Sequence, residues 1–175
     1  MSKTICITGM HRSGTSLTTS WLQACGLTVD NGHLIGVAAG NLKGHFEDKE
    51  FVDLHTKIIL KENLSSRGWI ESSKSYSFQA SDKEGIKMLI KERQKFAQWG
   101  WKDPRTVLFL EEWVSLIPHI KFIFLWRPAY QVVNSLIERR KGSSNRDFKI
   151  NKIKGVIASY TVNPLSLKSK DFLIF

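Results

Sequence analysis

The sequence predicts a three-layer α/β fold in which helices cover both faces of a central parallel sheet. Residues 4–8 and 121–126 are short runs of apolar and β-branched residues, which is typical of buried strands. Each run leads into a segment whose apolar residues recur at helical spacing, and strands that alternate with helices favour parallel pairing. The length of 175 residues is that of one domain, so we expect a single domain over residues 1–175.

The first predicted helix follows the strand at residues 4–8. Leu17, Trp21 and Cys25 recur at helical spacing, and Gly26 stands where a C-terminal cap belongs. Residues 27–45 are rich in glycine and lack any period, so we expect a loop there.

The second predicted helix spans residues 47–60, where Phe51, Leu54 and Ile58 recur at intervals of three and four. Glu47 continues this spacing, so we expect its side chain on the inward face; an acidic residue favoured by the helix dipole is an equally good interpretation. The remaining pattern predicts a Ser-rich loop over 63–80, helices over about 81–96, 104–117, 130–140 and 150–160, and a strand over 172–175.

The composition is that of an ordinary soluble globular protein, with 42% hydrophobic and 24% charged residues. Two cysteines are too few for a disulfide framework, which indicates a reducing compartment. No apolar run approaches the roughly 20 residues of a membrane helix, and the N-terminus does not have the pattern of a signal peptide. We therefore expect a cytoplasmic protein without a transmembrane segment.

The most specific motif lies between the first strand and the first helix. It reads Gly9-Met-His-Arg-Ser-Gly14-Thr15-Ser16, and Gly-x-x-x-x-Gly followed by two hydroxyl residues is the skeleton of a P-loop. The glycines let successive backbone N–H groups point inward, and the helix N-terminus adds positive potential, so the loop binds phosphate or sulfate. The alternative is a plain strand-to-helix turn in which Ser13 or Thr15 caps the helix.

One position separates this loop from those of nucleotide kinases. The lysine that normally follows the second glycine is replaced by Thr15, and the cation stands instead at Arg12. Without that lysine the β- and γ-phosphates of ATP lose their usual point-charge partner, so nucleotide hydrolysis is disfavoured.

These residues resemble the sulfotransferases that use 3′-phosphoadenosine 5′-phosphosulfate (PAPS). The resemblance rests on three elements in the family's order: residues 12–16 as the 5′-phosphosulfate loop, Arg127 with Ser135 eight positions later, and the Lys-Asp-Pro stretch within residues 100–105. It extends from about residue 5 to about residue 160. It implies a P-loop-type fold and transfer of a sulfuryl group from PAPS to a hydroxyl or amine acceptor, leaving adenosine 3′,5′-bisphosphate.

The resemblance also implies roles for individual residues. The loop residues Arg12, Ser13, Gly14, Thr15 and Ser16 would hold the 5′-phosphosulfate, with Arg12 at the bridging oxygen and the sulfonate. Arg127 and Ser135 would bind the 3′-phosphate, and Lys102 would add a second cation at the reacting centre.

The predicted general base is Glu47, with Asp48 and His45 as alternatives, and His11 lies inside the loop where it could face the acceptor. We find no group of residues with metal-ligand spacing and expect no metal. A glycan, a lipid, a small alcohol or a tyrosine hydroxyl would serve as the acceptor.

Two further expectations concern the end of the chain. Members of this family usually continue further, so we expect a shortened domain lacking the family's C-terminal part, with weak or no activity. Nine basic and two acidic residues from Arg139 onward carry +7 of the net charge of +10. This basic segment makes a nucleic-acid-binding module the second alternative, beside a P-loop kinase. The placing of Trp21, Trp113 and Trp126 within apolar patterns predicts core positions instead and argues against specific nucleic-acid binding.

Overall fold

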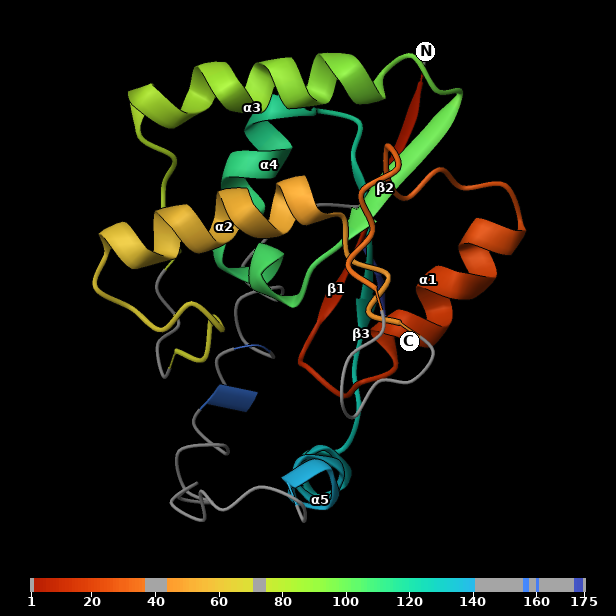
Figure 1. Ribbon diagram of the computed structural model, residues 1–175, viewed down its shortest axis with the longest axis vertical. Helices are drawn as coiled ribbons and strands as arrows, with labels where there is room; N and C mark the ends of the chain where they lie inside the picture. Colours follow the sequence, from red (N-terminus) through yellow and green to blue (C-terminus); the bar gives the residue numbers. More distant parts are fainter. Residues whose placement is uncertain are drawn as a thin grey trace.

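The structure, a computed structural model, describes residues 2–36, 44–70, 75–140, 156–157, 160 and 172–174 (Figure 1). The elements in chain order are β1 (Lys3–Gly9), α1 (Thr15–Ala24), α2 (Lys49–Lys61), α3 (Ala80–Arg93), β2 (Gln98–Lys102), the 3₁₀ helix η1 (Pro104–Phe109), α4 (Leu110–Leu116), β3 (Lys121–Leu125), α5 (Ala129–Arg140) and β4 (Phe172–Ile174). None of the described helices is long and apolar enough to cross a membrane.

The described strands form one parallel sheet with the order β2-β1-β3-β4. The register sets Lys102 of β2 beside Ile7 of β1, and Leu125 of β3 beside Gly9 of β1. The carboxyl ends of three strands therefore meet at one edge of the sheet. The segments after these ends carry every motif singled out above except Glu47, and parallel α/β proteins bind their ligands at this edge.

Helices cover both faces of the sheet, which confirms the predicted α/β class. In Figure 1, α2, α3 and α4 lie on one side of the strands and α1 lies on the other. Successive strand residues alternate between two hydrophobic clusters: Cys6 and Phe122 belong to the larger cluster with Phe51, whereas Ile7 and Ile123 belong to the smaller one. This alternation is the period of two expected for strands buried on both faces.

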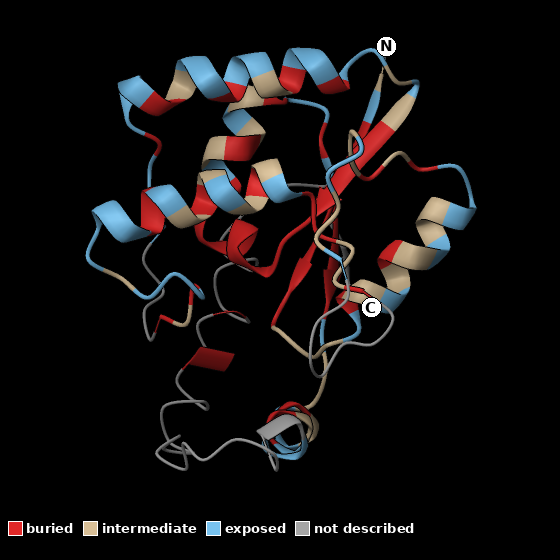
Figure 2. Cartoon of the chain, in the orientation of Figure 1, coloured by how far each residue is buried: buried red, intermediate tan, exposed pale blue. Residues whose placement is uncertain are grey.

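Helix α1 lies where a helix was predicted, with Cys25 as its C-cap, but Leu17 and Trp21 point outward. Leu17 is 50% exposed and Trp21 is 63% exposed, whereas Thr15 and Thr19 are buried, and Figure 2 shows the outer face of this helix as exposed. The buried Thr19 hydroxyl donates to the Thr15 carbonyl, so its hydrogen-bonding capacity is satisfied within the helix. The prediction that Trp21 belongs to the core is wrong.

Trp126 also differs from its predicted core position, since it is 51% exposed, whereas Trp113 is fully buried as predicted.

Strand β2 was not predicted from the sequence. Its two tryptophans, Trp99 and Trp101, are fully buried in the larger cluster, and a Cβ on the intervening Gly100 would lie 1.9 Å from the carbonyl oxygen of Ile5. Only glycine allows β2 to lie this close to β1 at that position.

The other elements lie within a few residues of their predicted bounds. The segment that begins at Pro104 opens as a 3₁₀ helix before α4, and α3 ends at Arg93, three residues before the predicted end. The predicted terminal strand is present as β4. Of the basic segment that begins at Arg139, the structure describes the helical backbone of residues 139–140, and its other basic residues lie outside the described residues. Of the helix predicted near 150–160, the structure describes only residues 156, 157 and 160, all helical.

Candidate functional site

The loop after β1 has the backbone of an anion-binding nest. Gly9 has φ +136°, and a Cβ there would lie 2.3 Å from the carbonyl oxygen of Leu125, so strand β3 leaves no room for a side chain. Arg12 and Gly14 have φ +72° and +99°, and Gly14 is the N-cap of α1. When residues with positive φ lie between residues in the right-handed conformation, successive backbone N–H groups point toward one position.

No side chain caps the first turn of α1. The Ser13 hydroxyl donates to the Met10 carbonyl at 2.6 Å, and the Ser16 hydroxyl donates to the His45 carbonyl at 3.1 Å. The alternative in which Ser13 or Thr15 caps the helix is therefore wrong. The N–H groups at the start of α1 keep their capacity to bind an anion.

Arg12 joins this loop to the start of α5. Its Nε donates to the Ser135 hydroxyl at 2.9 Å, and its carbonyl accepts from Nη1 of Arg127 at 3.1 Å. Arg127 also donates from Nε to Gln131 at 2.9 Å. The structure thus brings together three residues predicted to bind the cofactor, at positions 12, 127 and 135. Arg12 itself contacts both residues of the predicted 3′-phosphate site.

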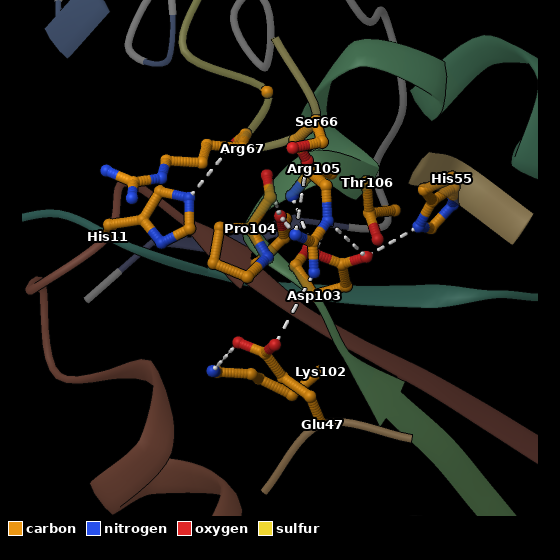
Figure 3. Close-up of polar contacts among 12 residues, drawn as sticks. His11, Glu47, His55, Ser66, Arg67, Lys102, Asp103, Pro104, Arg105 and Thr106 are labelled. Atoms are coloured by element: carbon orange, nitrogen blue, oxygen red, sulfur yellow. Dashed lines mark hydrogen bonds and ion pairs between the residues drawn. The ribbon is translucent and has the colours of Figure 1, made fainter. Parts of the chain in front are cut away.

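Two predicted catalytic residues form an ion pair beside the loop. Lys102, the last residue of β2, donates from Nζ to Oε1 of Glu47 at 2.6 Å and to the His45 carbonyl at 3.0 Å (Figure 3). Arg105 approaches the other oxygen of Glu47, with Nη2 at 3.4 Å from Oε2. Lys102 and Glu47 are 3% and 8% exposed, so this is a buried cluster of charges.

Glu47 reaches this cluster from just outside the helix in which it was predicted. Helix α2 begins at Lys49, because Asp48 is the N-cap and its carboxylate accepts the N–H of Glu50 at 2.9 Å. The inward direction of Glu47 was predicted correctly, although the residue lies before the first turn. Its position is fixed by Lys102 and Arg105 instead of by helical periodicity.

A buried hydrogen-bond chain holds Arg105 in place. Asp103 accepts from the Nε of Arg105 at 3.1 Å and from Nδ1 of His55 at 2.7 Å, and Nε2 of His55 accepts from the indole N–H of Trp113 at 3.1 Å. The indole can only donate, so His55 carries its single proton on Nδ1 and is neutral. Burial alone would raise the pKa of Asp103, but the Arg105 charge and the His55 hydrogen bond outweigh it and hold that pKa below its ordinary value.

Asp48, an alternative to Glu47 as the predicted general base, contacts Arg93 and the start of α2. Its carboxylate is fully buried and accepts from Nη2 of Arg93 at 2.7 Å as well as from the Glu50 N–H. Burial raises the pKa of Asp48, and the Arg93 charge opposes that rise. A carboxylate used in this way fixes the start of α2 against α3. His45, the other predicted alternative, takes part through its backbone carbonyl, which accepts hydrogen bonds from Lys102 and Ser16.

Several members of the site could not be identified from the sequence. Neither Arg105 nor His55 belongs to a pattern in the sequence that indicates its place in the site. The backbone around residues 66–68 was treated only as a Ser-rich loop. It meets the site at two points, since the Arg67 carbonyl lies 3.2 Å from Nε2 of His11 and the Gly68 carbonyl accepts from the Tyr160 hydroxyl at 2.8 Å. Contacts made by loop backbone leave no signal in residue type.

No protein-family model and no curated protein sequence matches the chain. Two solved structures show a partial likeness to it. A sulfotransferase of Mycobacterium tuberculosis aligns with 99% of this chain and 62% of its own, at 11% identity and a TM-score of 0.49. A gluconokinase of Sinorhizobium meliloti aligns with 98% of this chain and 81% of its own, at 12% identity and a TM-score of 0.44. The chain spans less than two thirds of that sulfotransferase, and neither likeness bears on its activity.

Proposed function

We propose that the chain binds PAPS and transfers its sulfuryl group to a hydroxyl or amine acceptor. The observation that carries this proposal is the contact of Arg12 with both Ser135 and Arg127, which sets a second group of anion-binding side chains beside the loop. A nucleotide with phosphates at both the 5′ and the 3′ positions suits two adjacent anion sites. A nucleoside triphosphate suits a single loop with the lysine that Thr15 replaces here.

The donors around the loop fit such a cofactor. The loop offers backbone N–H groups and the uncapped start of α1, and both Arg12 in the loop and Arg127, which contacts it, are permanent cations. In this proposal the amides and hydroxyls of residues 13–16 hold the 5′-phosphate, and Arg127 with Ser135 holds the 3′-phosphate. The bound cofactor supplies an activated sulfuryl group on a phosphate leaving group.

Arg12 and Lys102 are proposed to stabilise the charge that develops during transfer. The bond between sulfur and the bridging oxygen breaks, so negative charge grows on the departing phosphate, where fixed N–H donors are most effective. Arg12 is permanently protonated and supplies charge and hydrogen bonds but no proton. Lys102 is linked to the loop through the His45 carbonyl, which also accepts from the Ser16 hydroxyl.

Glu47 stays the predicted general base in this scheme. Both of its oxygens are paired, one with Lys102 and one with Arg105. An anionic cofactor competes for Lys102, so we expect Glu47 to accept a proton only after Lys102 turns toward the cofactor. The separation of the two side chains on cofactor binding is a direct structural test of this role.

Thermal unfolding with different nucleotides tests the proposal. Adenosine 3′,5′-bisphosphate at about 100 times its dissociation constant adds about 2.7 kcal/mol, or about 5–10 °C for a domain of this size. We expect this shift with the native chain, and a much smaller one with Arg127→Ala and with Ser135→Ala. Lys91→Ala, which removes an exposed cation from α3, is the control and should keep the shift. A shift with ATP and Mg²⁺ but none with the bisphosphate would favour a kinase.

A further inference from the structure

His11 is a loop residue whose imidazole lies next to the charged cluster. Figure 3 shows it beside Arg67, with one ring nitrogen turned toward the Arg67 carbonyl and the other turned away. Its ring also contacts two aromatic side chains, with centroids 6.0 Å from that of Trp69 and 6.3 Å from that of Tyr160. These contacts fix the plane of the ring.

The hydrogen bond to Arg67 determines where the proton of His11 resides. A backbone carbonyl can only accept, so Nε2, 3.2 Å from the Arg67 oxygen, carries the hydrogen. In a neutral imidazole the other nitrogen, Nδ1, then holds a free lone pair. Among the described residues none donates a hydrogen bond to this Nδ1.

Loss of hydration and nearby positive charges keep this imidazole neutral. Loss of hydration lowers the pKa of His11 most, the positive charges of Arg105 and Lys102 lower it further, and the pKa reaches about 3. Asp103 and the Arg67 carbonyl act in the opposite direction but do not compensate. The hydroxyl of Tyr160 stays protonated, because burial raises its pKa well above neutrality. Glu47 is the other acid of this cluster, and Arg67 adds a cation on the adjoining loop.

We propose that Nδ1 of His11 is a second proton acceptor of the site and takes the proton of the attacking hydroxyl or amine while Glu47 stays paired with Lys102 and Arg105. The geometry points to it because His11 belongs to the loop itself and its Nδ1 lone pair accepts no hydrogen bond from the described residues, whereas both oxygens of Glu47 are occupied by cations. This inference rests on the proposed function. In the transfer step the acceptor oxygen bonds to sulfur, the sulfur–oxygen bond to phosphate breaks, and the acceptor proton moves to Nδ1.

Binding of the cofactor would make His11 a better base. A phosphate in the loop lies among the same groups that act on His11, and its negative charge opposes the fields of Arg105 and Lys102. The pKa of His11 therefore rises on binding, toward the range in which a general base is effective. Proton affinity and cofactor affinity are linked, so binding at mildly acidic pH is accompanied by proton uptake at this residue.

Nuclear magnetic resonance of the labelled imidazole tests this without an acceptor. In the free protein we expect the Nε2–H form to persist from about pH 8 down to about pH 5. With adenosine 3′,5′-bisphosphate bound, we expect His11 to take up a proton within that range. An Nδ1–H form, or an imidazole that titrates at the same pH in both samples, would overturn the inference. Absence of bisphosphate binding would instead overturn the proposed function, so the two failures are distinguishable.

Substitutions separate proton transfer from loop structure. His11→Gln places an amide N–H where Nε2 lies and keeps the bond to Arg67 but removes the base. We expect cofactor affinity within about twofold of native and cleavage of PAPS, with water or an added alcohol as acceptor, slower by about 100-fold or more. His11→Ala should regain part of that rate when imidazole is added, in proportion to its neutral form. Full activity of His11→Gln, with loss in Glu47→Gln alone, would assign the proton to Glu47.

Discussion

Replacing Lys102 by methionine removes the charge closest to Glu47 and keeps most of the side-chain volume. The pair is buried, with Lys102 and Glu47 only 3% and 8% exposed, and its atoms lie 2.6 Å apart. Lys102→Met leaves the Glu47 carboxylate inside the protein with one remaining cation, Arg105, at 3.4 Å. The energetic consequence of this loss can be measured without any substrate.

The expected cost follows from the geometry. Removing one partner of a buried ion pair costs about 3–5 kcal/mol, because the other charge stays buried without compensation. Since Glu47 keeps Arg105, we place Lys102→Met at the lower end, about 3 kcal/mol of the free energy of unfolding. For a domain of this size that lowers the Tm by about 6–12 °C.

The double variant Lys102→Met/Glu47→Met provides the decisive comparison. It replaces both charges by apolar side chains, and such replacements are often neutral or stabilising. Urea unfolding of the native chain, the two single variants and the double variant gives the coupling energy. We expect the double variant to be more stable than Lys102→Met alone. Single costs that simply add, within about 0.5 kcal/mol, would refute a direct pair between the two residues.

Two further predictions concern the loop and the effect of acid. Gly14→Ala should cost about 1–2 kcal/mol through its left-handed backbone alone, since a Cβ there meets no atom, whereas Gly9→Ala should cost more because its Cβ collides with Leu125; urea unfolding of both variants compares them. Asp103 and Asp82 have pKa values held below their ordinary ones, against the effect of burial, by Arg105 and Lys61 respectively. Their stabilisation is present above the unfolded pKa and is lost as the pH falls through the folded pKa. Stability should therefore fall below about pH 4, and less steeply in Asp82→Asn; an unchanged slope in that variant would contradict the assignment.

Strong local patterns predicted most of the fold. The apolar runs at residues 4–8 and 121–126 are strands β1 and β3, and the spacing of Phe51 and Ile58 correctly placed one face of α2 in the core. Strand β2 could not be found in this way. It is only five residues long, and its central Gly100 is required by contact with β1, which the sequence does not display.

The face of α1 that was predicted to be buried is exposed, for a related reason. The apolar spacing of Leu17 and Trp21 predicts a buried stripe, but both residues are exposed and the threonines of the opposite face are buried. Helix α1 starts directly after the tight loop that follows β1, and this loop sets its orientation. Local periodicity reports only which residues share a face, and the choice of the inward face is made by the rest of the fold.

Within the candidate site, residues that belong to motifs could be predicted and residues that act through tertiary contacts could not. The family resemblance assigned Arg12 to the loop and paired Arg127 with Ser135, and the three residues meet in the structure. The role of Arg105 depends on Asp103 and on His55, which is 48 residues away from Asp103 in the chain. No spacing rule predicts such a contact.

We propose that the loop and the Arg12, Arg127 and Ser135 group recognise a nucleotide with both a 5′- and a 3′-phosphate. Calorimetric titration with adenosine 3′,5′-bisphosphate and with adenosine 5′-monophosphate tests it most directly. We expect the bisphosphate to bind about 10–100 times more tightly, because its second phosphate gains hydrogen bonds to charged groups. Arg127→Ala should remove this difference and Lys91→Ala should keep it. Equal affinity for the two nucleotides in the native chain would contradict the account.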